Sequence, residues 1–181
     1  MAIRSPVKLP YAVDKSTGAQ ISIDYAHHEV HGGSHYYVEG FTTLATGASL
    51  LVKLVTPNTT KWSHFNWHIE SNGFLETYLY EDASGGMAGG ATITPLNNNR
   101  NSSNTSSMMI VSGVATPTTY VTTISQKSWG GTGFKTTSGG GSGREDELVL
   151  KQDATYCRTF VSGSDDNIVS FKAFWYEHTD K

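Results

Sequence analysis

From Ile21 onward, short apolar and aromatic runs alternate with clusters of turn-forming residues. One such run extends from Lys61 to Ser71. Apolar residues occupy alternate positions in it, at Phe65, Trp67 and Ile69, and polar residues stand between them. Because successive side chains of a strand point to opposite faces, this alternation predicts a strand with one buried face. Short strands at close spacing predict a sandwich or a barrel.

Ten segments carry this pattern, which is enough for two packed sheets. No stretch shows the sustained i, i+3, i+4, i+7 spacing of an amphipathic helix, so we expect at most a short helical turn or two. We therefore predict an all-β, two-sheet β-sandwich, with strand ends placed to within ~2–4 residues. The predicted strands are Ile21–Tyr25, Ser34–Thr43, Ser49–Thr56, Lys61–Ser71, Phe74–Glu81, Met108–Val114, Tyr120–Gln126, Glu147–Lys151, Thr155–Ser162 and Ile168–Glu177.

The chain of 181 residues is long enough for one domain with its own hydrophobic core. We assign residues 21–181 to this single β-sandwich domain and residues 1–20 to an extended N-terminal arm, because Pro6 and Pro10 favour an extended backbone there. Three long segments rich in Gly, Ser and Asn interrupt the strands. We expect them to be loops that either make contacts or are disordered, and they are Asp82–Gly90, Leu96–Ser107 and Trp129–Arg144.

Charge and cysteine content narrow the possible partners. The net charge is −3 and the 13 Lys and Arg residues are scattered, which argues against a nucleic-acid partner. The N-terminus lacks the apolar core of a secretory signal, and no run reaches the ~18 apolar residues of a membrane span, so we expect no membrane partner. Cys157 stands alone, which excludes an intramolecular disulfide and favours a buried core position.

The stretch HHEVHGGSH, residues 27–35, contains four of the seven histidines. It does not have the zincin spacing H-E-x-x-H, and glycines 32 and 33 would end a helix. On an extended chain, His27, Glu29 and His31 would share a face and form a two-His-one-carboxylate set. The alternative is a polar strand end followed by a Gly-Gly turn, which we favour. We therefore predict no metal at His27, Glu29, His31 or His35, and no cofactor.

Other catalytic patterns are absent as well. The serine at 142 lies in GGSGR, where arginine takes the place of the last glycine of G-x-S-x-G. The glycine clusters at 130–133 and 139–143 lack the G-x-x-x-x-G-K pattern of a phosphate-binding loop. Adjacent acids at 145–147 and 165–166 are typical of solvated turns, not of a glycosidase pair. We therefore predict that the chain is not an enzyme.

Four segments resemble small virion proteins of tailed bacteriophages: IDYAHHEVHGGSHY (23–36), TPNTTKW (56–62), TPLNNNRNSS (94–103) and FWYEHTDK (174–181). The resemblance implies a head decoration (cement) protein of jelly-roll type that binds across subunits of the major capsid protein. It further implies a homo-oligomer, a trimer rather than a dimer, on the outer surface of the virion capsid, assembled in the cytoplasm of the bacterial host. No catalytic residues carry over from this family. The alternative is a tail or receptor-binding module that binds carbohydrate.

On the decoration hypothesis, the arm and one or more long loops contact the partner. The arm offers apolar anchors and basic groups, and its prolines cannot donate to a sheet. On the alternative hypothesis, Trp129 and the loop from Asn97 to Asn104 form a sugar-contacting edge. The candidate partner-binding residues are Arg4, Pro6, Val7, Leu9, Tyr11, Asn97, Asn98, Asn99, Arg100 and Trp129.

Overall fold

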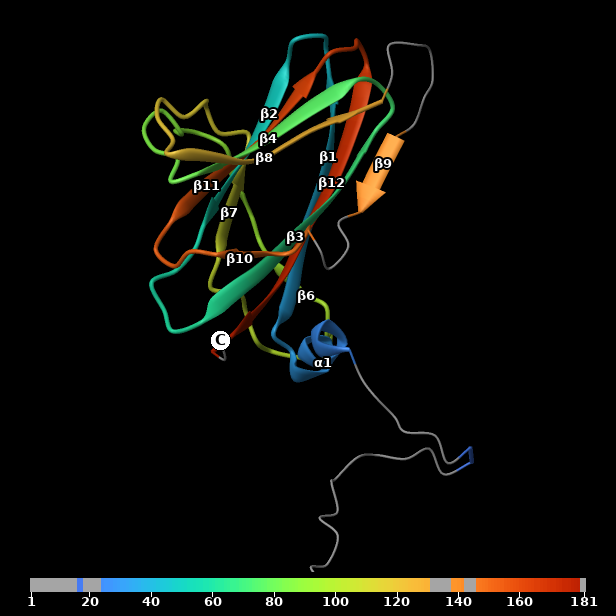
Figure 1. Ribbon diagram of the computed structural model, residues 1–181, viewed down its shortest axis with the longest axis vertical. Coiled ribbons are helices and arrows are strands. Elements are labelled where there is room, and N and C mark those ends of the chain that lie inside the picture. Colours follow the sequence, from blue (N-terminus) through green and yellow to red (C-terminus); the bar gives the residue numbers. More distant parts are fainter. Residues whose placement is uncertain (1–15, 18–23, 131–137, 142–145, 180–181) are drawn as a thin grey trace, which may run out of the picture.

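The structure is a computed structural model, and it describes residues 16–17, 24–130, 138–141 and 146–179, with only the backbone described for 138–141. The described residues form twelve strands and one short α-helix. The strands form two six-stranded sheets in which the described pairings are all antiparallel. The prediction of an all-β chain with two sheets is therefore confirmed, and Figure 1 shows the two sheets facing each other.

We name the two sheets after their first strands. The β1 sheet has the order β10-β3-β12-β1-β6, and β9 pairs with β3 beside β10. Its strands are β10 (Leu148–Leu150), β3 (Trp62–Ser71), β12 (Asn167–His178), β1 (His35–Leu44), β6 (Leu96–Asn97) and β9 (Ser138–Gly141). The β2 sheet has the order β5-β7-β2-β11-β4-β8. Its strands are β5 (Ala91–Ile93), β7 (Met109–Ser112), β2 (Ser49–Val55), β11 (Thr155–Ser162), β4 (Leu75–Glu81) and β8 (Thr122–Trp129).

The strand pairs are nested along the chain. β1 pairs with β12, β2 with β11, β3 with β10, and β4 with β8. The first long strand thus pairs with the last strand of the chain. Each following strand pairs with one that lies earlier in the sequence than the partner before it. This is the pattern of one long antiparallel hairpin wrapped around itself, so most contacts join residues far apart in the sequence.

The main core lies between the two sheets and follows the alternation of the sequence. Phe65, Trp67 and Ile69 on β3 are buried in it, as predicted, and they meet the inward side chains of β12. Trp175 and Phe65 stack with ring centroids 5.8 Å apart. Each large side chain buried in this way contributes about 1.5–3 kcal/mol relative to an exposed position.

The helix α1 (Tyr25–Gly32) occupies a segment for which the sequence predicted strand. The Asp24 side chain accepts a hydrogen bond from the Ala26 amide as N-cap, and Gly33, at φ 72°, closes the helix as C-cap. These two caps enclose only eight residues, too short a stretch for a helical period to stand out in the sequence. The predicted strand at 21–25 is wrong at Asp24 and Tyr25, and its other residues lie outside the described ones.

The other nine predicted strands each overlap an observed strand. The sequence missed the short strands β5, β6 and β9, and it had placed β6 and β9 inside loops. The predicted arm, residues 1–20, lies outside the described residues apart from 16 and 17. Among the described residues, no helix is long and apolar enough to cross a membrane.

Candidate functional site

The outer face of the β2 sheet is covered by its own loops. Side chains that point away from the main core on three of its strands form a second buried cluster with residues of the segments 82–90 and 113–121. A bridge between Ser84 and Thr119 holds these two segments together. The buried members of the cluster are Leu51, Ala83, Val111, Val114 and Cys157, with Tyr80 and Met87 packed against them.

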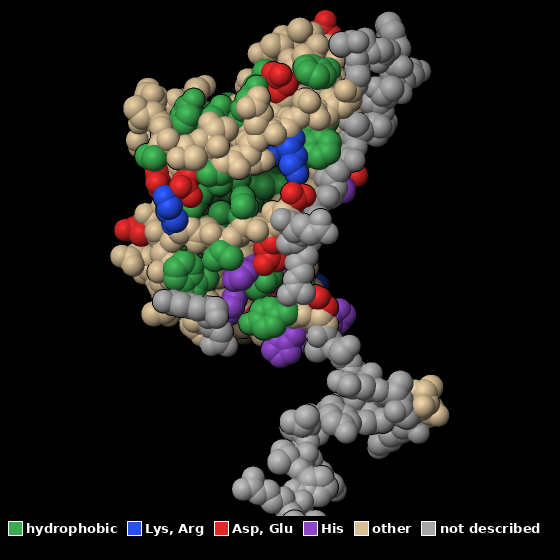
Figure 2. Space-filling view, in the orientation of Figure 1, with side chains coloured by type: hydrophobic (Ala, Val, Ile, Leu, Met, Phe, Trp, Pro, Cys, Tyr) green, Lys and Arg blue, Asp and Glu red, His purple; other side chains and the backbone are tan. Residues whose placement is uncertain are grey.

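The outer face of the β1 sheet has a different character. Its cross-strand rows are made of histidine, tyrosine, glutamate and lysine side chains; one row joins His64, Tyr176 and His35, and another joins His68, Lys172 and Glu39. Among the described residues, no second apolar cluster forms on this face. Figure 2 shows histidines gathered at the end of the molecule where α1 lies. This face is therefore the candidate functional surface.

One edge of this sheet is open along most of β1. β12 pairs with the whole of β1 on one side, whereas β6 pairs only with Tyr36 and Tyr37 on the other. Residues 38–44 of β1 thus have no second partner strand within the described part of the chain. Phe41, on the outer face of this edge, is 81% exposed, and Ile168 nearby is 50% exposed. Exposed apolar groups on an unpaired edge are a feature that soluble proteins usually avoid unless a partner binds there.

A groove of about 680 Å³ runs across the outer face next to this edge. Gly40 is one of its lining residues, and a Cβ atom added there would face the main core, within 3.1 Å of the buried Phe171 ring. His68 hydrogen-bonds Glu70 at 3.0 Å, and this contact lowers the pKa of Glu70. The groove is lined by Glu39, Gly40, Phe41, His68, Glu70, Ser170, Phe171 and Lys172, so it combines charges of both signs with an exposed aromatic ring.

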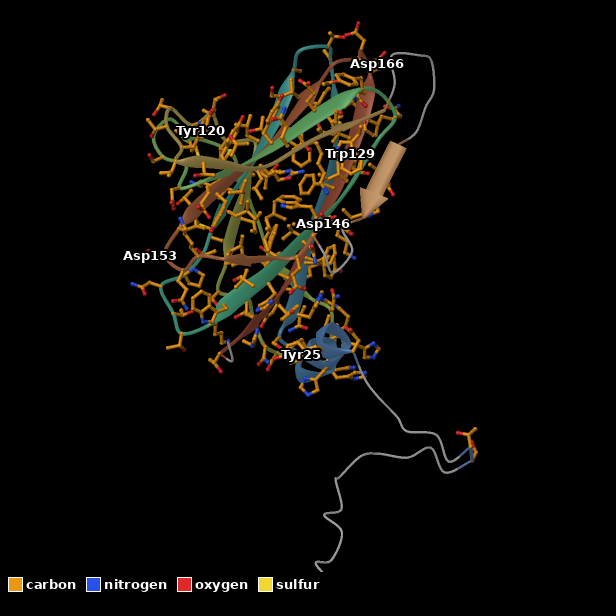
Figure 3. All side chains as sticks on the ribbon, viewed as in Figure 1. Tyr25, Tyr120, Trp129, Asp146, Asp153 and Asp166 are labelled. Atoms are coloured by element: carbon orange, nitrogen blue, oxygen red, sulfur yellow. The ribbon has the colours of Figure 1, made fainter. Side chains whose placement is uncertain are left out.

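At the opposite end of the same face, histidines from β3 and β12 meet. The Nδ1 atom of His64 lies 2.7 Å from Glu147 Oε1, and Tyr176 Oη donates to the same carboxylate oxygen over 2.9 Å. The Nε2 atom of His64 lies 2.8 Å from Nε2 of His178. Tyr25 Oη of α1 lies 3.3 Å from His178 Nδ1 and so connects the helix to the sheet (Figure 3). Glu147, read from the sequence as a solvated carboxylate, is thus part of a half-buried network.

His27, Glu29 and His31 do not form the two-His-one-carboxylate set that an extended chain would give, because they lie on α1. His27 and His31 face each other on the helix with their Nε2 atoms 2.9 Å apart, but Glu29 turns away and hydrogen-bonds Ser34. Burial alone would raise the pKa of Glu29, but the hydrogen bonds with Ser34 and His28 lower it. Within the described ranges, no group of three or more His, Cys, Asp and Glu residues could hold a metal ion.

The predicted asparagine loop packs on the molecule itself. Asn97 is buried and donates to the Gly33 carbonyl over 2.9 Å, and Asn99 donates to the His31 carbonyl over 3.1 Å. Arg100 Nη1 donates to the Asn97 carbonyl over 3.4 Å, while Asn98 donates its backbone amide to the carbonyl of His35. These contacts attach the loop to α1 and the start of β1. The predicted contact residues Arg4, Pro6, Val7, Leu9 and Tyr11 lie outside the described residues.

Trp129 is placed differently from the prediction. It is the last residue of β8 and packs, half-buried, against the main core. Among the described residues, its indole Nε1 has no hydrogen-bond partner. Figure 3 places it far from Tyr25, at the other end of the sandwich from the asparagine loop. The structure therefore does not bring Trp129 and residues 97–104 together into one sugar-binding edge.

A buried cation lies in the main core. Arg158 on β11 is 2% exposed, and burial lowers its pKa to about 10. Its Nη2 atom donates to Thr77 Oγ1 over 2.9 Å, and its guanidinium carbon lies 5.7 Å from the centre of the Trp67 ring. Within the described residues it makes no ion pair, and its charge is stabilised by the Trp67 ring and the Thr77 hydroxyl.

The candidate surface is thus the outer face of the β1 sheet, from the open edge at Phe41 to the histidine network at His64. No local sequence pattern indicates either feature, because each is assembled from strands that are distant along the chain. No family model, curated protein or solved structure matches this chain.

Proposed function

We propose that the chain is a non-enzymatic structural protein of a bacteriophage particle that decorates and stabilises the capsid by binding across major capsid protein subunits. The observation that carries this proposal is the open edge of β1 beside the exposed side chain of Phe41. A partner strand can pair with such an edge through main-chain hydrogen bonds, and the exposed ring can provide an apolar anchor.

The strand order supports a jelly roll. Eight strands pair as β1 with β12, β2 with β11, β3 with β10 and β4 with β8, and these pairs alternate between the two sheets. A ribbon of nested pairs that wraps into two facing sheets is the jelly-roll arrangement, which is common among viral capsid proteins but also occurs in lectins and cupins. The fold is therefore compatible with a particle protein. Because lectins and cupins share it, the choice among these functions depends on the residues of the surface.

Capsid binding can be measured by sedimentation with purified, undecorated capsids. We expect Phe41→Ser to weaken binding at least about tenfold, because an exposed aromatic anchor at an interface often dominates the affinity. Val121→Ser is the matched control, since Val121 is 73% exposed but belongs to the loops that cover the other sheet. Equal binding by both variants would contradict the role of the β1 edge, and no binding by the unchanged protein would contradict decoration.

The arm is proposed to contribute to the same binding. The helix α1 begins at Tyr25 and contacts β1 and β12 at the end of the β1 sheet, so the chain enters the sandwich beside the candidate surface (Figure 1). Deletion of residues 2–15 is expected to reduce sedimentation with capsids while the far-ultraviolet spectrum stays unchanged. A truncated protein that folds and binds capsids as well as the full chain would contradict this role.

A tail or receptor-binding module that binds carbohydrate is the second candidate. The observation that favours it is a stack of tyrosines at the β2 sheet: Tyr120, in the covering segment 113–121, has its ring centroid 4.2 Å from that of Tyr80 on β4, and Tyr78 lies parallel to Tyr80. A second groove, of about 360 Å³, adjoins Tyr78. Aromatic faces beside polar groups are suited to sugars. Hundreds of copies per particle would indicate decoration, whereas a dozen would indicate the tail.

A further inference from the structure

Two imidazole rings of the β1 sheet point their Nε2 atoms at each other. His64 lies on β3 and His178 is the last residue of β12, and their Nε2 atoms are 2.8 Å apart. At this distance either one nitrogen donates a proton to the other or both lone pairs face a common cation. The groups around the two rings favour a particular protonation state for His64.

The carboxylate of Glu147 determines the tautomer of His64. An ionised carboxylate only accepts hydrogen bonds, so the His64 Nδ1 atom, 2.7 Å from Glu147 Oε1, carries the proton. In the neutral ring, Nε2 therefore holds a lone pair directed at His178. A carboxylate that orients a histidine through its other ring nitrogen is the usual support of a metal-binding histidine.

The hydroxyl of Tyr25 supports His178 in the same way. It lies 3.3 Å from His178 Nδ1, and a phenol hydroxyl can accept a hydrogen bond as well as donate one. With Nδ1–H donating to Tyr25, the Nε2 atom of His178 is free to act as a ligand. Both Nε2 atoms can therefore present lone pairs to the same point.

We propose that His64 and His178 bind one divalent transition metal ion of the zinc class between their Nε2 atoms. Imidazole nitrogen is a preferred ligand for such ions, at about 2.0–2.1 Å from zinc. Tetrahedral geometry at that length places two nitrogens about 3.3 Å apart with the ion off the line between them, so the rings need to separate by about 0.5 Å and turn until both lone pairs converge on the ion. The Glu147 carboxylate beside His64 adds negative charge, and water completes the coordination. This inference goes beyond the proposed function and does not depend on it.

The helix α1 contains a second histidine pair that can be compared with His64 and His178. His27 and His31 also have their Nε2 atoms 2.9 Å apart, but their side chains are exposed, and no carboxylate among the described residues hydrogen-bonds either Nδ1 atom. A pair without orienting partners must lose more side-chain freedom when it binds an ion. We therefore expect the first equivalent of metal to bind at His64 and His178, in agreement with the prediction that His27, Glu29, His31 and His35 hold none.

The test uses the full chain, prepared without a histidine tag and stripped with a chelator. Calorimetric titration with Zn²⁺ and absorption titration with Co²⁺ are expected to show one saturable equivalent. His64→Ala or His178→Ala should weaken binding at least about tenfold, and Glu147→Gln about 10–100-fold, because its carboxylate orients a ligand. The double variant His27→Ala/His31→Ala should bind within about twofold of the unchanged protein.

Circular dichroism and thermal unfolding establish that each variant is folded. If His64→Ala is unfolded, His178→Gln serves in its place, since His178 ends its strand and partly faces solvent. Absence of saturable Zn²⁺ binding up to about 1 mM would overturn the proposal and leave an N–H···N hydrogen bond between the rings. Binding that disappears in the His27→Ala/His31→Ala variant and persists in folded His64→Ala would overturn it as well.

Discussion

The two sheets share one core but differ on their outer faces. Outside the β2 sheet, the segments 82–90 and 113–121 bury Leu51, Val111 and Cys157 under a second apolar cluster. Outside the β1 sheet, the described residues leave polar and aromatic rows, an open edge and a groove. The loops over the first face add buried apolar contacts, whereas the described part of the chain places no such cover over the second. The thiol illustrates this: burial raises the pKa of Cys157, which makes it less reactive.

The largest expected effect on stability comes from removing a buried apolar side chain under the loops that cover the β2 sheet. Leu51 is 5% exposed, and its replacement by alanine leaves a cavity under the loops, so we expect Leu51→Ala to lower the free energy of unfolding by about 2–5 kcal/mol. Urea unfolding measures this loss. Phe41→Ala on the open face is the matched control and should change stability by no more than about 0.5 kcal/mol. Similar losses in both variants would remove the distinction between the two faces.

A smaller effect is expected from the loop that forms the cover. Gly89 and Gly90 both have positive φ, near 76° and 82°. An added Cβ atom at Gly89 meets nothing within 4 Å, whereas one at Gly90 would lie 2.6 Å from the Ser112 carbonyl oxygen. We expect Gly89→Ala to cost about 1 kcal/mol from backbone strain, and Gly90→Ala about 2–3 kcal/mol because a clash is added. Equal costs in urea unfolding would mean that the loop can move away from β7.

The sequence predicted the strands better than the surfaces they form. Alternation along Lys61–Ser71 was sufficient to place Phe65, Trp67 and Ile69 in the core, because burial on one face is a local property. The contact of His64 with Glu147 and His178 joins residues separated by 83 and 114 positions, and no local pattern indicates such a pairing.

Helix capping explains why the sequence predicted a strand where α1 begins. Asp24 and Gly33 are residue types that cap helices, but the stretch between them is too short to show a helical period, and its histidines resemble a polar strand end. The glycine-rich surroundings of Trp129 likewise indicated a loop, whereas β8 extends to this residue and its ring packs against the main core.

The smallest expected effect is the change in the free energy of unfolding at low pH that comes from His35, on the open face of the β1 sheet. This first residue of β1 is 7% exposed, stacks against Phe174 and Tyr176, and has no hydrogen-bond partner for its Nδ1 atom among the described residues. Burial lowers its pKa below the ordinary value of 6.5, and the positive charge of Lys172 lowers it further, while Glu29 and Glu147 act in the opposite direction. The unfolded chain therefore binds the proton more readily than the folded protein.

It follows that the contribution of His35 to stability is complete above pH 6.5 and is lost as the pH falls from there through the lowered pKa of the folded state. His35→Phe keeps the stacking and removes the titration. The difference in free energy of unfolding between the unchanged protein and this variant, measured in urea from pH 7.5 to pH 5, should therefore shift in favour of the variant as the pH falls. Leu51→Ala, on the covered face, should show no such shift. A constant difference for His35→Phe would show that the proton binds equally well to this histidine in both states, and that this end of the open face is more accessible to water than its packing indicates.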